Sequence, residues 1–206
     1  MSTGLAAVRA LALGRPIVVV TAGGPGPRAE LVLAAERATA HAVAFLVRHG
    51  AGFLRVALSD DDADRLDLPV MYPPGSRGAP ERDCVAVDAA HGTTTGISAA
   101  DRARTISLLA APASTPRDFT RPGHVIPVRA AADATGGTLP AALALASRAG
   151  LRPVVASCAL VSSSDPVLLA GPREAREFAA RTGLAVVHAA GPLRGVDVLT
   201  TATLRM

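Results

Sequence analysis

The chain has 206 residues, of which half are hydrophobic and only 2% are aromatic, and its formal net charge is +4. This length fits one large domain whose core is built from Val, Leu, Ile and Ala. Apart from the five histidines, every basic residue is an arginine. Mechanisms that need a lysine nucleophile or a lysine Schiff base are therefore excluded.

The same composition bears on partners and location. The arginines are dispersed, with no basic block among aromatic residues, so we expect no nucleic-acid partner. Cys84 and Cys158 lie far apart and form no zinc-ligand or disulfide pattern. The apolar run Leu5–Leu13 is interrupted by Arg9 and predicts an amphipathic helix, not a signal peptide. No run approaches the length of a membrane span, so we expect no membrane partner and a cytoplasmic location.

Apolar periodicity and turn residues define the expected elements. In chain order we expect helix Gly4–Leu13, strands Ile17–Thr21 and Leu31–Ala35, helix Thr39–Arg48, strands Phe53–Leu58 and Cys84–Val87, helix Ala99–Ala110, strand Val125–Val128, helix Leu139–Ala149, strand Val154–Leu160, helix Arg173–Arg181 and strand Leu184–Val187. Pro127 places its strand at an edge or a bulge, and Pro73–Pro80 is expected to be a loop. With no internal repeat, residues 1–206 are interpreted as one α/β (α+β) domain with a mixed sheet.

The glycine-rich stretch after the first strand invites comparison with a nucleotide-binding loop. Residues 21–28 read TAGGPGPR. A phosphate-binding P-loop needs a Lys, which the chain lacks, and Pro25 and Pro27 remove N–H groups that such a loop would use as donors. A nucleotide loop is therefore not predicted here.

The segment TTTGISAADRARTI, residues 93–106, carries the densest polar pattern. Ser98 and Asp101 stand in capping-box spacing at the start of a helix. Thr94 and Thr95 add hydroxyls just before this helix, and a helix N-terminus favours anions and polar ligands. The segment by itself fits both a ligand-binding loop and a well-capped surface helix.

Two histidines are candidates for chemistry. His124, in RPGHVIPVR, enters a strand from a loop, and an imidazole there is suited to general acid–base catalysis or to a hydrogen bond within the loop. His49 ends a helix just before Gly50, where the helix dipole by itself explains a histidine.

Five segments taken together resemble one family. RHGAGF, LDLPVM, TTTGISAADRARTI, RPGHVIPVRA and AGLRP occur in the order and spacing of 3,4-dihydroxy-2-butanone 4-phosphate synthase, over about Leu5 to Val187. The resemblance implies a three-layer α/β domain and a homodimer with sites near the subunit interface. It also implies conversion of ribulose 5-phosphate to a four-carbon ketone phosphate and formate with magnesium. The chain is expected to carry no fused cyclohydrolase.

The sequence departs from the family pattern where the metal and phosphate are held. Gly26 stands at the position of a metal-binding Glu, and Thr138, Leu139 and Pro140 replace a His-Thr-Glu motif. Thr135 is nearest to the phosphate-binding Arg. A further Glu of the family, which follows a cysteine late in the sheet, is replaced by Ala159. These departures predict no metal site and no cofactor.

From the retained and lost residues we expect a repurposed, metal-independent enzyme of specialised metabolism that acts on a small-molecule substrate by enolisation, dehydration or cyclisation. His124 and Asp101 are the expected catalytic residues, with Asp101 orienting His124. The residues expected to bind substrate are Thr94, Thr95, Ser98, Arg102, Thr105 and His49. The alternatives are a non-catalytic pseudoenzyme that binds a ligand or partner, and a genuine 3,4-dihydroxy-2-butanone 4-phosphate synthase of riboflavin biosynthesis.

Overall fold

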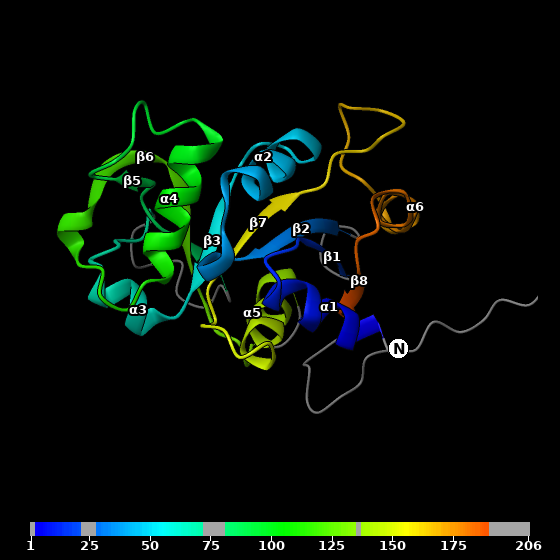
Figure 1. The fold of residues 1–206 in the computed structure, drawn as a ribbon, viewed down its shortest axis with the longest axis horizontal. Coiled ribbons are helices and arrows are strands. Elements are labelled where there is room, and N and C mark those ends of the chain that lie inside the picture. The colour runs from blue at the N-terminus through cyan, green and yellow to red at the C-terminus, as the bar shows by residue number, and fades with distance from the viewer. Residues whose placement is uncertain (1–2, 22–27, 72–80, 135–136, 190–206) are drawn as a thin grey trace, which may run out of the picture.

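A mixed β-sheet organises the chain (Figure 1). The computed structural model describes residues 3–21, 28–71, 81–134 and 137–189. The strands are β1 Ile17–Thr21, β2 Arg28–Ala34, β3 Arg55–Leu58, β4 Glu81–Asp83, β5 Val87–Ala89, β6 Phe119–Ala130, β7 Val155–Ala159 and β8 Val186–Ala189. The helices are α1 Thr3–Ala12, α2 Ala40–His49, α3 Asp60–Arg65, α4 Ala99–Ala110, α5 Thr138–Arg148 and α6 Pro172–Thr182, with short 3₁₀ turns at Ala35–Arg37 and Pro116–Asp118.

The strand order is β4-β6-β3-β7-β2-β1-β8, and β5 pairs with β6 outside this path. The pairs β3–β6 and β1–β8 are parallel, and the other pairs are antiparallel. The mixed sheet expected from the sequence is therefore confirmed.

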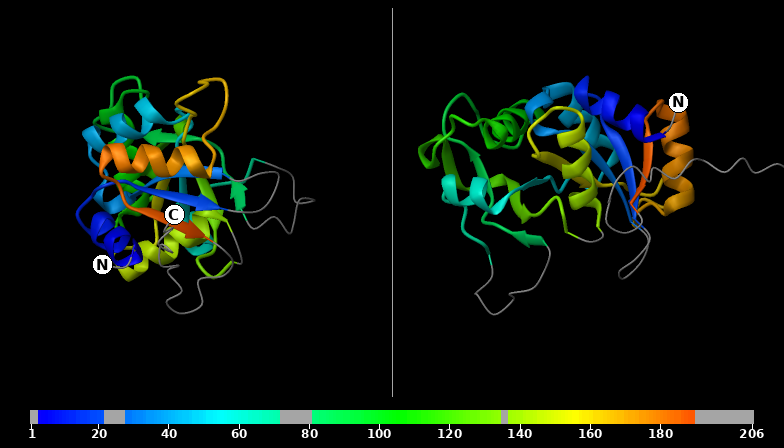
Figure 2. Two further views of the ribbon diagram at one scale, coloured as in Figure 1. Left: turned by 90° about the vertical axis from the view of Figure 1, so that its right-hand side faces the viewer. Right: turned by 90° about the horizontal axis from the view of Figure 1, so that it is seen from below.

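Helices cover both faces of the sheet and make three layers, as Figures 1 and 2 show. On one face α2, α4 and α6 pack over Leu33 and Val56 of the sheet. On the other face α1 and α5 pack over a second cluster that includes Val19 and Val155. The helices contact the sheet mainly through aliphatic side chains, because the chain has only five Phe and Tyr residues and no Trp.

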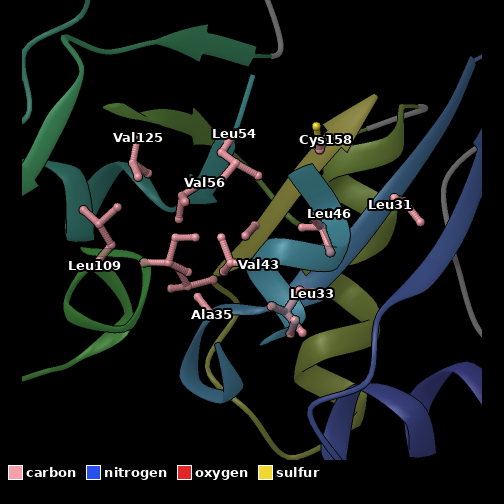
Figure 3. Close-up of a cluster of buried hydrophobic side chains, with 14 of the residues drawn as sticks. Leu31, Leu33, Ala35, Val43, Leu46, Leu54, Val56, Leu109, Val125 and Cys158 are labelled. Atoms are coloured by element: carbon pink, nitrogen blue, oxygen red, sulfur yellow. The ribbon is translucent and has the colours of Figure 1, made fainter. Parts of the chain in front are cut away.

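The larger cluster joins α2 and α4 to the central strands (Figure 3). Val43 and Leu46 of α2, Leu109 of α4 and Val56 of β3 are fully buried in it. Thr39 begins α2 because its hydroxyl accepts a hydrogen bond from the Ala42 N–H at 3.2 Å. Ser98 begins α4 in the same way, accepting from the Asp101 N–H at 3.0 Å. The caps and the apolar faces fix where both helices start and how they lie on the sheet.

The strands differ from the expected ones chiefly at β2, around Cys84 and at β6. The strand expected at Leu31–Ala35 begins earlier, at Arg28. The strand expected at Cys84–Val87 is replaced by β4 before it and β5 after it, with Cys84 only in an isolated bridge to Val70.

The strand that holds His124 is three times longer than expected, with 12 residues, and it is not at an edge. Pro127 lies inside the sheet, opposite a position just beyond the end of β4. Its carbonyl accepts from the Cys84 N–H there, and β4 does not continue far enough to require an N–H donor from the proline. The expected loop at Pro73–Pro80 lies outside the described residues.

No helix in the described part of the chain has the length and apolar character needed to cross a membrane.

Candidate active site

The centre of the candidate site is a hydrogen-bonded pair, Asp88 on β5 and His124 on β6. The carboxylate of Asp88 contacts His124 twice, with Oδ2 2.7 Å from the ring Nδ1 and Oδ1 accepting from the His124 backbone N–H at 2.9 Å. Asp88 is 8% exposed, whereas the His124 side chain is 39% exposed. An ionised carboxylate can only accept, so this contact favours the tautomer with the proton on Nδ1 and leaves Nε2 of the neutral ring unprotonated.

Two glycines allow this pair to form. Gly96 has φ +83°, and a Cβ at this position would collide with the Asp88 carboxylate and lie 2.8 Å from His124 Nδ1. Gly123 lies against the backbone of Val87, where a side chain would collide with the peptide unit. Glycine is therefore required at both positions by close approach, and at Gly96 also by the backbone conformation.

Asp101 does not contact the His124 ring, and its bonds run instead to the loop before α4. Its Oδ2 accepts from the Thr94 hydroxyl at 2.8 Å and from the Gly96 N–H at 3.1 Å, and its Oδ1 accepts from the Thr94 N–H at 3.1 Å. These hydrogen bonds, that from the Thr94 hydroxyl foremost, hold the pKa of Asp101 below its ordinary value against the opposing effect of burial. Asp101 thus fixes the loop that places Gly96 beside Asp88.

The remaining expected site residues either make structural hydrogen bonds or are exposed at the surface. Thr105 is fully buried; its hydroxyl accepts from the Ala89 N–H at 2.9 Å and donates to the Asp101 carbonyl at 3.1 Å, so it ties α4 to β5. Ser98 caps α4, whereas Thr94 and Thr95 are exposed on the loop.

His49 lies apart from these groups, in an aromatic contact between α2 and α6. Its ring centroid is 4.6 Å from that of Phe45 and 5.2 Å from that of Phe178. Burial, and then the charge of Arg48, lower the pKa of His49 and so favour the neutral ring. The contacts described for its ring serve helix packing.

Arg102 lies near both Asp88 and Cys158, and Cys158 lines a cavity. Arg102 is 6% exposed, donates to the Gly52 carbonyl at 3.3 Å, and interacts electrostatically with Cys158 and Asp88, while burial lowers its pKa. The cavity has a volume of about 230 Å³. It is lined by Ala29, Glu30, Phe53, Arg55, Ser157, Cys158, Ala159 and Leu169.

A larger hollow of about 430 Å³ lies between α1 and the start of β8, lined by Arg9, Arg15 and mainly apolar residues. It contains no acid–base pair among its described lining residues, so size alone does not identify the site. The smaller cavity is the better candidate because several polar and titratable side chains line it, among them Glu30, Arg55 and Cys158.

Comparisons with known proteins agree with this architecture. The family model of 3,4-dihydroxy-2-butanone 4-phosphate synthase matches residues 5–191. A crystal structure described as 3,4-dihydroxy-2-butanone 4-phosphate synthase in complex with two magnesium ions is 35% identical, with a TM-score of 0.78 over 89% of this chain and 91% of that one. The chain belongs to the 3,4-dihydroxy-2-butanone 4-phosphate synthase family.

Its curated relatives are longer proteins. The riboflavin biosynthesis protein RibBA of Rhodococcus erythropolis is 44% identical over 190 residues, which are 89% of this chain and 44% of the relative. The protein of the same name from Salinispora tropica is 45% identical over 161 residues, 75% of this chain and 40% of the relative. The chain therefore spans less than half the length of these relatives.

These relatives overturn the expectation of a repurposed, metal-independent enzyme of specialised metabolism, which was wrong. Identity of 43–45% extends over most of the chain and joins it to proteins of riboflavin biosynthesis. The expectation gave a few changed positions, chiefly Gly26 and Thr138, more weight than this similarity. Gly26 lies outside the described residues, and Thr138 is a buried residue in the first turn of α5.

The described residues contain no assembled cluster of metal ligands. Magnesium takes oxygen ligands that include one or two carboxylates, but the stretch 22–27 has no acidic residue in its sequence. Within the described ranges no group of three or more His, Cys, Asp and Glu residues is placed to hold a metal. No described residue is therefore assigned as a magnesium ligand.

Sequence reasoning missed Asp88, Arg55 and Ser157. Asp88 stands between Val87 and Ala89, shortly before the motif-rich segment 93–106, and an acid in a short buried strand is the signal that would have found it. Arg55 and Ser157 are polar residues inside the apolar stretches FLRVAL and VVASCAL. Such interruptions are informative because buried polar groups need partners or a function.

The role of Asp101 can be tested by pH. Because its folded pKa is lowered, its carboxylate stabilises the fold fully above the ordinary pKa of about 3.9, and this contribution is lost as the pH falls through the folded value. Asp101→Asn should lower the urea midpoint at pH 7, and the difference from the parent should shrink at pH 3. The exposed Asp133→Asn is the control and should change neither midpoint. An equal deficit for Asp101→Asn at both pH values would contradict this role.

Proposed function

We propose that the chain catalyses the reaction for which its family is named, the formation of 3,4-dihydroxy-2-butanone 4-phosphate and formate from ribulose 5-phosphate, in cytoplasmic riboflavin biosynthesis. The observation that carries the proposal is the Asp88–His124 pair, with Nδ1 held 2.7 Å from the carboxylate and the ring partly open to solvent. Membership in the family and the names of the relatives support the choice of reaction.

The pair is suited to the proton transfers that such a reaction needs. Nε2 of His124 takes a proton from the carbon or hydroxyl beside the substrate carbonyl, and the ring becomes an imidazolium. Asp88 holds the ring in place and stabilises the positive charge that forms on it. The imidazolium then returns the proton at a later step, so that the histidine ends in its starting form.

Arg102 and the backbone of the 94–98 loop complete the described part of the site. Arg102 carries a buried positive charge near Asp88. A positive charge there favours the negative charge that develops on the substrate oxygen when the proton leaves the carbon. The exposed Thr95 hydroxyl is suited to bind a substrate oxygen, whereas the Thr94 hydroxyl and the Thr94 and Gly96 N–H groups donate to Asp101.

We further propose that two copies assemble, as the resemblance implies. Phe53 and Leu169 line the cavity, and each exposes more than half of its surface. Val167, next to Leu168 on the same segment, is 84% exposed. An apolar surface at a cavity is typical of an interface. Light scattering after size exclusion should give twice the chain mass, and Phe53→Glu should lower it to the monomer mass; a monomeric parent would contradict this assembly.

The reaction is tested by formate release from ribulose 5-phosphate with Mg²⁺ in the buffer. His124→Ala should lower the rate about 10²–10⁴-fold, because a positioned acid–base group contributes this much. Asp88→Asn should also lower the rate, because an amide can donate to Nδ1 and so favour the other tautomer of His124. Asp133→Asn is the control and should match the parent.

Formate release at the level of the blank by the folded parent protein would contradict the proposed function. Full activity of His124→Ala would instead show that another group is the base.

A further inference from the structure

The motif RPGHVIPVR begins with an arginine that the acid–base chemistry does not use. Arg121 precedes His124 by three residues on β6. Its Nη2 donates to the carbonyl of Leu66 at 3.0 Å and to the carbonyl of Asp67 at 2.7 Å. Both carbonyls belong to the motif LDLPVM, so the Arg121 side chain joins two of the segments that carry the family resemblance.

The part of β6 that holds His124 is a large bulge. In the pairing of β5 with β6, Val87 is opposite Val125, whereas the next residue, Asp88, is opposite Thr120. Residues 121–124 therefore have no partner in register on β5. A bulge bends its strand and re-aims its side chains. This one lets the ring and the backbone N–H of His124 contact the same carboxylate.

Side-chain hydrogen bonds hold the bulge at its two ends. His124 is bonded to Asp88 at the end of the bulge. Arg121 is bonded at the start of the bulge to the carbonyls that follow α3, a helix that lies beside β6 (Figure 1). Pro122 and Gly123, which stand between them, have no side chain that can form a hydrogen bond. The path of the bulge therefore depends on Arg121 as well as on Asp88.

The point to which Arg121 is attached is itself well fixed. Leu66 and Leu68 are fully buried, and the Leu68 carbonyl accepts from Arg129 Nη2 at 2.8 Å. Leu66 is the residue that ends α3. Carbonyls at a helix C-terminus lack donors within the helix and interact favourably with a cationic side chain. Arg121 thus bonds to a buried and suitably polarised part of the fold.

The guanidinium of Arg121 lies against the protein and does not extend freely into water. Its Nε is buried and has no hydrogen-bond partner among the described residues. A buried donor without a partner costs free energy. The two hydrogen bonds from Nη2 offset this cost, so they determine where the side chain lies.

We propose that Arg121 is a positioning residue, which holds the start of the 121–124 bulge through the Leu66 and Asp67 carbonyls and so keeps the His124 ring on Asp88. The inference deepens the proposed function and rests on it for the reaction. Arg121 acts through the backbone and not on the substrate. Its loss should therefore lower kcat and leave KM nearly unchanged.

Arg121→Met is the main test, because methionine keeps an apolar stem and removes the donors. The kcat for formate release from ribulose 5-phosphate should fall about 10-fold to 10²-fold, since small misplacements of a catalytic group cost this much. KM should stay within about twofold of the parent value. In nitrogen-15 NMR, the preference of the His124 proton for Nδ1 should be lost.

Two other arginines provide matched controls. Arg117→Met removes an equal charge at an exposed position on the turn before β6, where no hydrogen bond or ion pair with a described residue is lost. Arg65→Met removes hydrogen bonds from α3 to the Ser114 carbonyl and to Asp62, without a contact to β6. Both controls should keep the parent's kcat and the parent's His124 signals.

Arg121→Lys supplies a second variant that keeps a charged donor, so its kcat should stay within about fivefold of the parent. It also decides the matter if Arg121→Met does not fold. Parental kcat and parental His124 signals in a folded Arg121→Met would overturn the proposal. A higher KM with parental kcat in either variant would also overturn it, because Arg121 would then bind substrate. A larger loss of kcat in Arg121→Lys would do the same.

The two proposals fail in different ways. If the parent releases no formate but Arg121→Met still loses the Nδ1 preference of His124, the proposed reaction is wrong and the positioning role stands. If formate is released and the folded Arg121→Met matches the parent in kcat and in the NMR signals, the positioning role is wrong and the reaction stands.

Discussion

The hydrogen bond between Asp88 and His124 is the constraint around which the described site is arranged. Gly96 and Gly123 make room for it, and Asp101 holds the loop that carries Gly96. Thr105 fastens α4 to the strand that carries Asp88. These contacts join two segments 36 residues apart and leave one nitrogen of the imidazole accessible. Packing, glycine placement and one buried carboxylate together hold the His124 ring in place.

The 230 Å³ cavity depends on a different physical feature, the register of the central strands. Because β3 and β7 are antiparallel neighbours, Arg55 and Ser157 meet on one face of the sheet. Arg55 reaches past β6 to Glu81 and Asp83 of β4, which keep the guanidinium charged and fixed. A one-residue slip in this register would turn both side chains to the opposite face. The fold therefore sets the polarity of the cavity as well as its shape.

Local signals predicted the elements best. Thr39 and Ser98 mark the starts of α2 and α4, since each side chain accepts from an N–H three residues later and an apolar face follows. The strand β6 was underestimated because Pro122 and Gly123 resemble a turn in sequence, although they lie within a strand that packs closely on β5. Residues that are close in sequence indicate helix capping and apolar periodicity, but they do not indicate which strands pair.

The candidate site was only partly predictable for the same reason. His124, Asp101 and Arg102 were predicted from motifs, and Asp101 was expected to orient His124. Asp88 contacts the ring instead, and this pairing follows from the β5–β6 register, which the sequence does not display. Arg55 and Ser157 become neighbours only when β3 and β7 pair. The functional expectation failed because absent ligands at a few positions were weighed above similarity along the whole chain.

The central claim is that Asp88 fixes the proton of His124 on Nδ1 and leaves Nε2 as the base. Nitrogen-15 NMR of the histidine-labelled protein near pH 8 measures this directly, with His124→Ala used to assign the signals. His124 Nδ1 should have the shift of a protonated ring nitrogen and Nε2 that of an unprotonated one, and Asp88→Asn should remove this preference. A proton on Nε2 in the parent protein, or the same tautomer in Asp88→Asn, would contradict it.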